Sequence, residues 1–158
     1  MGALSLAGWI ALSLATGAIG AIASVDSREF YAALERPSWA PPGWLFGPVW
    51  TTLYVLMGVA AWLVWRAPRA ARLRVPGLWL FVLQLVLNAL WTWIFFHWRS
   101  GVWAFAEIAL LWLLIVAVIA CFAKVRPPAA WLLAPYLGWV TFAMALTWSV
   151  WQRNPVEL

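Results

Sequence analysis

The sequence predicts an all-α integral membrane protein, a bundle of five transmembrane helices. Hydrophobic residues make up 66% of the chain and charged residues 9%, too little charge to cover a soluble domain of 158 residues. The charged residues also leave five long apolar stretches, each longer than the roughly 20 residues that cross a hydrocarbon core about 30 Å thick. These stretches are continuously hydrophobic and lack the period-two alternation of barrel strands, so we expect helices.

The apolar stretches predict one domain over residues 1–158 with short connections between its spans. A cleaved signal peptide is an alternative for the first span, because Ala21-Ile22-Ala23 fits the small-residue cleavage pattern. No Lys or Arg precedes this span, however, and its length suffices to cross a membrane, which favours a retained helix. The expected spans are residues 3–24, 44–65, 75–97, 101–123 and 128–151.

The longest connection, residues 26–43, follows the first span. Asp26 with Glu29 three residues later resembles a capping box, and the short surface helix that it predicts ends at Pro37. The proline-rich segment that follows is expected to be extended, because each proline moves its predecessor out of the α region. This is the only connection long enough to fold over the bundle as a lid; an ordinary surface loop is the alternative.

Several classes of site are excluded by counting residues. The single Cys121 and the single His97 rule out an internal disulfide, a cysteine cluster and a two-histidine metal site, so we expect no metal and no required cofactor. The net charge of +5 does not indicate nucleic-acid binding, because many basic residues lie in the 66–74 connection, where they act as topology determinants. Basic residues are more numerous on the side that holds the N-terminus, which predicts a cytoplasmic N-terminus.

Polar and aromatic residues gather in the half of the bundle nearer the predicted lid. With a rise of 1.5 Å per residue, Trp50 and Glu107 lie about 9 Å below that face, Trp91 about 10 Å and Asn88 about 15 Å. Intramembrane ionisable and amide groups usually turn inward and are functional candidates. We therefore expect an aromatic pocket under the lid, which Trp139 and Ala143 of the last span also reach.

Each of these residues has a plainer interpretation. For Asn88 this is an inter-helix hydrogen bond, and for Glu107 it is a protonated or snorkelling residue near the interface. Ser13, Gly17 and Ala21 form a seam of small residues, which suits close packing within the bundle or across a dimer. Seven of the sixteen tryptophans lie near span ends and are expected in the interfacial belt. They are Trp9, Trp44, Trp65, Trp98, Trp103, Trp131 and Trp151.

The order of short motifs along the whole chain resembles the translocator protein family, also called tryptophan-rich sensory protein or peripheral-type benzodiazepine receptor. The motifs are Arg36-Pro37-Ser38-Trp39-Ala40-Pro41-Pro42-Gly43, Pro48-Val49-Trp50, Leu87-Asn88-Ala89-Leu90-Trp91 and Pro135-Tyr136-Leu137-Gly138-Trp139. The resemblance is to the family's bacterial members and implies a five-helix membrane receptor, often a homodimer. It implies protoporphyrin IX and related flat apolar molecules as ligands, with a role in tetrapyrrole homeostasis and stress regulation.

Site residues follow from the same resemblance. It implies that Trp50 and Trp139 act as a redox-active pair if the protein breaks down porphyrin in light. Together with the pocket argument, the implied ligand-binding residues are Tyr31, Trp39, Pro42, Trp50, Asn88, Trp91, Glu107, Trp139, Ala143 and Leu146.

Sterol binding is less expected, because Trp148 stands where the family's sterol motif has tyrosine. Two other functions stay open: a transporter of tetrapyrroles or sterols, and a light-dependent enzyme. No inverted repeat supports the first. No acid–base dyad or nucleophile supports conventional catalysis.

Overall fold

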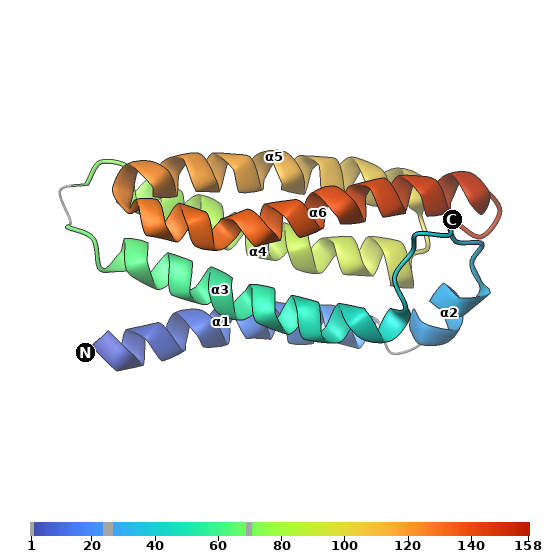
Figure 1. The fold of residues 1–158 in the computed structure, drawn as a ribbon, viewed down its shortest axis with the longest axis horizontal. Coiled ribbons are helices and arrows are strands. Elements are labelled where there is room, and N and C mark those ends of the chain that lie inside the picture. Colours follow the sequence, from blue (N-terminus) through green and yellow to red (C-terminus); the bar gives the residue numbers. More distant parts are fainter. Residues whose placement is uncertain (1, 24–26, 69–70) are drawn as a thin grey trace.

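Five long helices lie side by side along the long axis of the molecule (Figure 1). The structure is a computed structural model that describes residues 2–23, 27–68 and 71–158, and within these ranges it contains helices and no strands. Each long helix is apolar and long enough to cross a membrane, which confirms the predicted fold class. The long helices are α1 (Gly2–Ala23), α3 (Phe46–Trp65), α4 (Arg74–Thr92), α5 (Gly101–Val125) and α6 (Pro127–Arg153).

Prolines mark where several helices begin. Pro48, Pro76 and Pro127 each lie in the first turn of their helix, where a missing N–H costs no intrahelical hydrogen bond. α4 instead ends in a π-helical turn, η2 (Trp93–His97), in which the Trp98 N–H donates to the Trp93 carbonyl at 2.9 Å. Such turns are frequent at functional sites.

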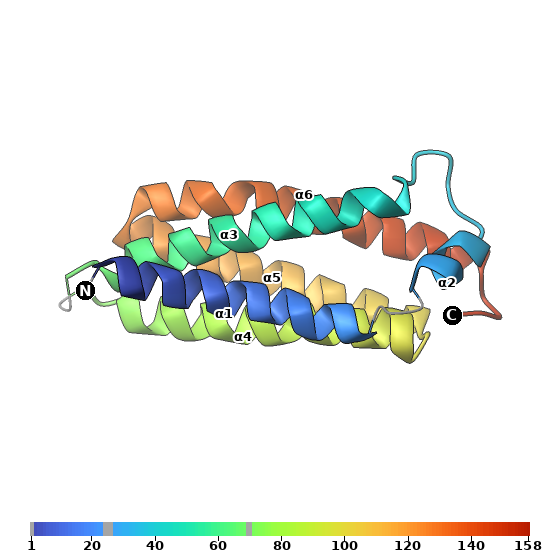
Figure 2. The same cartoon turned by 90° about the horizontal axis from the view of Figure 1, so that it is seen from below.

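The helices form a closed ring in the order α1, α3, α6, α5, α4, because each of these packs against the next and α4 returns to α1. Figure 2 shows α1 beside α4 and α3 beside α6. The core inside the ring is apolar, with Met57, Phe81 and Phe122 fully buried. This order places α5 on the side of the ring away from the contact between α1 and α3.

The connection between α1 and α3 carries a short helix, α2 (Ser27–Ala33), and a 3₁₀ turn, η1 (Gly43–Leu45), at one end of the bundle (Figure 1). We call residues 27–45 the lid segment. Tyr31 and Leu34 of this segment are buried against the bundle. The predicted cap residue Asp26 and the expected end of the first span at residue 24 lie outside the described residues.

Asn154 fastens the lid segment to the end of α6. Its side-chain Oδ1 accepts a hydrogen bond from the Glu35 N–H at 2.8 Å. Its Nδ2 donates to the Glu35 carbonyl at 2.9 Å and to the Val150 carbonyl at 2.7 Å. One buried amide therefore joins two segments that are far apart in the sequence.

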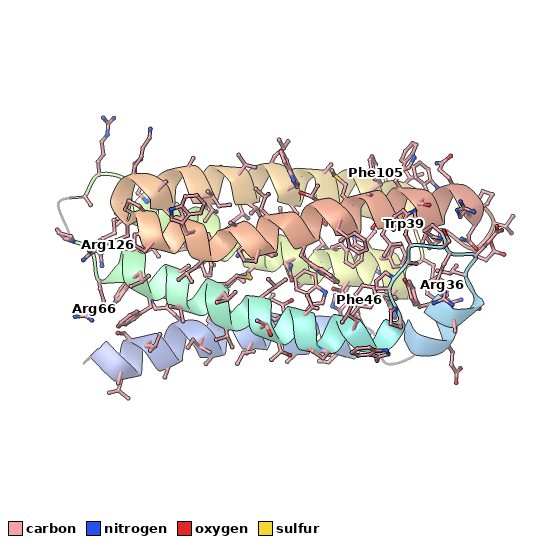
Figure 3. All side chains as sticks on the ribbon, viewed as in Figure 1. Arg36, Trp39, Phe46, Arg66, Phe105 and Arg126 are labelled. Carbon is pink, nitrogen blue, oxygen red and sulfur yellow. The ribbon has the colours of Figure 1, made fainter. Side chains whose placement is uncertain are left out.

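Most tryptophans of the predicted interfacial belt are exposed, and their place at the membrane interface stays a prediction. Five of its seven members are exposed, whereas Trp9 and Trp151 pack partly against neighbours. Arg66 and Arg126 lie at the end opposite the lid, and Arg36 lies at the lid end (Figure 3). The N-terminal orientation and the homodimer stay predictions.

Gly17 of the small-residue seam faces the inside of the bundle. A Cβ atom at Gly17 would lie 2.5 Å from Cε2 of the Tyr54 ring, and Ser13 is fully buried. A Cβ at Gly58 would likewise lie 2.6 Å from the Ile10 Cα, so α1 and α3 approach closely there. Ser13 and Gly17 thus serve packing within the bundle, whereas Ala21 is exposed, and a role of the seam between two copies stays a prediction.

Replacing Gly17 by leucine is expected to lower the stability of the folded protein by about 1–3 kcal/mol, because the new side chain displaces the Tyr54 ring. Association in detergent should not change. Light scattering with thermal unfolding measures both quantities. Gly8→Leu is the control, because its Cβ meets nothing within 4 Å. A stable Gly17→Leu protein with a smaller associated mass would show that the seam is a dimer face.

Candidate functional site

A cavity of about 930 Å³ opens at the lid end of the bundle, among α1, α3, α4, α6 and the lid segment. Eight of the residues that line it are aromatic, and four of these are tryptophans, Trp44, Trp50, Trp91 and Trp139. Gly17 and Ala18 of α1 form the opposite wall, where small side chains leave space. The remaining aromatic lining residues are Tyr31, Phe46, Tyr54 and Phe96.

Five of the predicted ligand-binding residues line this cavity. Tyr31 comes from α2, Trp50 from α3 and Trp91 from α4, while Trp139 and Ala143 come from α6. The sequence separation between the first and last of these residues is more than a hundred positions. The ring of helices therefore brings together residues that the depth argument placed at similar levels.

Aromatic contacts connect the walls to one another. Trp50 stacks on Tyr54 with ring centroids 5.5 Å apart. Phe46 meets Tyr31 of the lid edge-on at 5.6 Å and Trp139 of α6 at 5.9 Å. Because each ring is held by another, the cavity is lined by fixed aromatic surfaces, which lose little rotamer entropy when a ligand binds.

Two predicted lid residues lie on the outer side of this wall. Trp39 is half exposed and contacts Phe142 edge-on at 5.7 Å, and Phe142 in turn packs on Trp139 at 5.4 Å. Pro42 lines a smaller adjoining hollow of about 430 Å³. Figure 3 shows Trp39 at the lid end of the bundle. Trp39 therefore supports the wall through Phe142 and is not one of the cavity-lining residues.

Asn88 lies behind the cavity wall in a chain of buried polar side chains. Its Oδ1 accepts a hydrogen bond from the Tyr54 hydroxyl at 2.6 Å, and its Nδ2 donates to the Tyr136 hydroxyl oxygen at 3.1 Å. The Tyr136 hydroxyl donates to Gln84 Oε1 at 2.8 Å. Tyr54 is the member of this chain that lines the cavity, so Asn88 acts on the site through Tyr54.

Glu107 and Leu146 also lie away from the cavity lining. Glu107 is 8% exposed, and neither of its carboxylate oxygens has a hydrogen-bond partner among the described residues. No residue of α5 lines the cavity, because α5 lies on the far side of the ring. Leu146 is buried in a separate apolar cluster with Ile94 and Phe95. The roles predicted for these two residues in ligand binding stay predictions.

The indole N–H groups of Trp91 and Trp139 are buried and have no hydrogen-bond partner within the described chain. Both residues line the cavity. A buried donor without a partner is costly, and an acceptor on a bound molecule would remove that cost. Both nitrogens are fully covered by protein atoms in this structure, however, so we assign them no role in ligand recognition.

Tyr31 supplies a hydroxyl at the lid side. Burial raises the pKa of its phenol, and the nearby Arg36 guanidinium partly opposes this by lowering the same pKa. The phenol is consequently neutral near pH 7 and donates a long hydrogen bond to the Pro41 carbonyl at 3.4 Å.

Several lining residues are not among the site residues predicted from the sequence. Tyr54 follows Trp50 by one helical turn, and Phe46 precedes it by one, so helical spacing from Trp50 was the available signal. Trp44, expected in the belt, is strongly exposed and also borders the cavity. The predicted redox role of Trp50 and Trp139 stays a prediction, although both line one cavity.

Comparison with known proteins gives a consistent result over nearly the whole chain. The model of the TspO/MBR family matches residues 9–152. The chain is 42% identical to the tryptophan-rich protein TspO of Chlorobaculum tepidum over 153 residues, which cover 96% of this chain and 97% of that protein. It is 41% identical to the human translocator protein over 130 residues, 82% of this chain and 77% of that protein.

A third relative is the tryptophan-rich sensory protein of Cereibacter sphaeroides, 36% identical over 137 residues, which cover 85% of this chain and 82% of that protein. The five apolar helices, the aromatic cavity at their lid end and these matches agree with the resemblance seen in the motifs. The chain is an integral membrane protein that belongs to the TspO/MBR family.

Proposed function

We propose that this protein is a membrane receptor or sensor that binds porphyrins of the protoporphyrin IX type, and related flat apolar molecules, in the lid-end cavity. The role would be linked to tetrapyrrole homeostasis and stress regulation. The observation that carries this proposal is the convergence of four tryptophans from the lid segment, α3, α4 and α6 on one cavity. The family also contains proteins named as sensory.

The shape and chemistry of the cavity suit such a ligand. Its volume of about 930 Å³ lies near the top of the range of roughly 300–1,000 Å³ typical of small-molecule and cofactor sites. Trp50 and Trp139 present broad rings on which a flat macrocycle stacks with offset geometry. Thr51 and Thr92 also line the cavity and add hydroxyl groups to its mostly apolar wall.

Replacing Trp50 or Trp139 by phenylalanine is expected to weaken binding of protoporphyrin IX about fivefold, because a smaller ring loses stacking area. The measurement is quenching of intrinsic tryptophan fluorescence during a titration in the dark, so that photochemical loss of porphyrin does not contribute. Each variant should also lose more of the maximal quenching than one indole among sixteen would account for.

Trp131→Phe is the matched control, because Trp131 is exposed at the start of α6, at the end of the bundle opposite the lid. Its titration should match that of the unmodified protein apart from a small loss of total signal. If Trp50→Phe and Trp139→Phe behave like this control, the assignment of the cavity as the porphyrin site is wrong.

A further inference from the structure

Arg36 places a positive charge in the lining of the aromatic cavity, at the lid end of the bundle. It borders both the main cavity and the smaller hollow beside it. Among the described residues that line the main cavity, it is the only charged one. Figure 3 shows Arg36 at the lid end, on the same side as Phe46.

The lid segment holds this guanidinium in place. Its carbon lies 4.9 Å from the centre of the Tyr31 ring, a cation–π geometry that suits the flat arginine head. Tyr31 is itself buried and packs on Phe46. Pro37 follows Arg36 directly and restricts its backbone to extended conformations. The charge therefore rests on a fixed platform in the cavity lining.

The guanidinium has no acidic partner in the described part of the chain, where no carboxylate lies within 4.0 Å of it. The neighbouring Glu35 pairs instead with Arg153 at 3.6 Å. Arginine binds carboxylates with two parallel hydrogen bonds, so an unpaired guanidinium in the cavity lining is suited to an anionic group on a ligand.

We propose that Arg36 determines which flat molecules the cavity accepts by binding a carboxylate at the ligand's edge while the apolar body lies among the tryptophans. The ligand class is thus a planar apolar molecule that carries an acidic side chain. This inference rests on the proposed function and adds to it a preference for acids over neutral molecules of the same shape. Arg36 is exposed, so the preference should be about fivefold rather than larger.

The test compares protoporphyrin IX, which carries two carboxylates, with its dimethyl ester, which has the same macrocycle and no charge. Both are titrated in the dark into the full-length protein in nanodiscs of neutral phosphatidylcholine. The unmodified protein should bind the acid about fivefold more tightly than the ester. Arg36→Met should lose this preference while still binding the ester normally, and Arg36→Lys should retain part of it.

Arg99→Met is the matched control. The Arg99 guanidinium lies 4.7 Å from the centre of the Phe30 ring of α2, so it is also an arginine stacked on the lid segment, but it does not line the cavity. This variant should keep the full preference for the acid. Unchanged ester binding by Arg36→Met shows that its cavity is intact, so a misfolded variant cannot imitate the expected result.

The inference is overturned if the unmodified protein binds acid and ester equally, or if Arg36→Met keeps the preference for the acid. Failure of the proposed function looks different, because neither compound would then bind the unmodified protein.

Discussion

Asn88→Leu is expected to destabilise the folded protein by about 2 kcal/mol, one of the largest single-residue effects in the molecule. The substitution removes the acceptor of the Tyr54 hydroxyl and the donor to Tyr136, all three groups being buried. Inter-helix hydrogen bonds in membranes average about 0.6 kcal/mol each, but two hydroxyls lose a partner here. Thermal unfolding in detergent, followed by circular dichroism, measures the loss.

A double-mutant cycle separates this network from simple loss of packing. Tyr54→Phe, Asn88→Leu and their combination should show a coupling free energy of about 1 kcal/mol, because the Tyr54 hydroxyl donates directly to Asn88. Tyr54→Phe with Thr141→Val is the control pair, since Thr141 bonds Trp112 and the Leu137 carbonyl and not Tyr54. Additive effects in the first pair would contradict a network that joins α3, α4 and α6 through Asn88.

The five helices could be predicted from the sequence because the length of an apolar stretch is itself the physical requirement for crossing a membrane. The presence of the lid helix could be predicted because its apolar residues share one face, but the helix ends at Ala33, four residues before the predicted end at Pro37. The depth of each residue in the membrane could also be predicted, because the rise per residue of a helix is constant. Trp50, Trp91 and Trp139 were brought together by this argument, and the cavity contains them.

The rotation of each helix about its axis could not be predicted in the same way. In a membrane, the face of a helix that contacts lipid is as apolar as the face that packs on other helices, so hydrophobic periodicity does not mark the buried face. Trp79 is strongly exposed and Phe81, two positions later, is fully buried, although both are aromatic. Glu107 illustrates the consequence, because its depth was placed beside Trp91 while α5 lies outside the cavity wall.

The order of the helices around the ring could not be predicted from the sequence either. Short connections make α4, α5 and α6 neighbours in sequence, but the packing of α3 against α6 depends on contacts between segments with two helices between them in the chain. Asn154 is a similar case. Nothing in its local sequence shows that its amide bonds Glu35, more than a hundred residues away.

Asn154→Ala is expected to release the lid segment from α6 without unfolding the bundle. The variant loses both hydrogen bonds to the Glu35 backbone, which leaves the Glu35 N–H and carbonyl without their partner. A loss of about 2 kcal/mol in local stability corresponds to roughly 30-fold faster hydrogen exchange of the Leu34 and Glu35 amides. Exchange measured by mass spectrometry on peptides of residues 27–43 reports this change, and helices α3 to α6 should exchange as before. Because Tyr31 and Arg36 of the lid line the cavity, porphyrin should also dissociate faster from this variant.

Arg153→Met is the control that separates loss of the buried Asn154 hydrogen bonds from a general weakening at the end of α6. Arg153 is the neighbour of Asn154 and also contacts Glu35, but through an ion pair of 3.6 Å whose side chains are 46% and 70% exposed. Exposed pairs of this kind contribute about 0–1 kcal/mol, so exchange in the lid should rise by no more than about fivefold. Lid exchange in folded Asn154→Ala that equals that of Arg153→Met would mean that the apolar contacts of Tyr31 and Leu34, and not Asn154, hold the lid on the bundle.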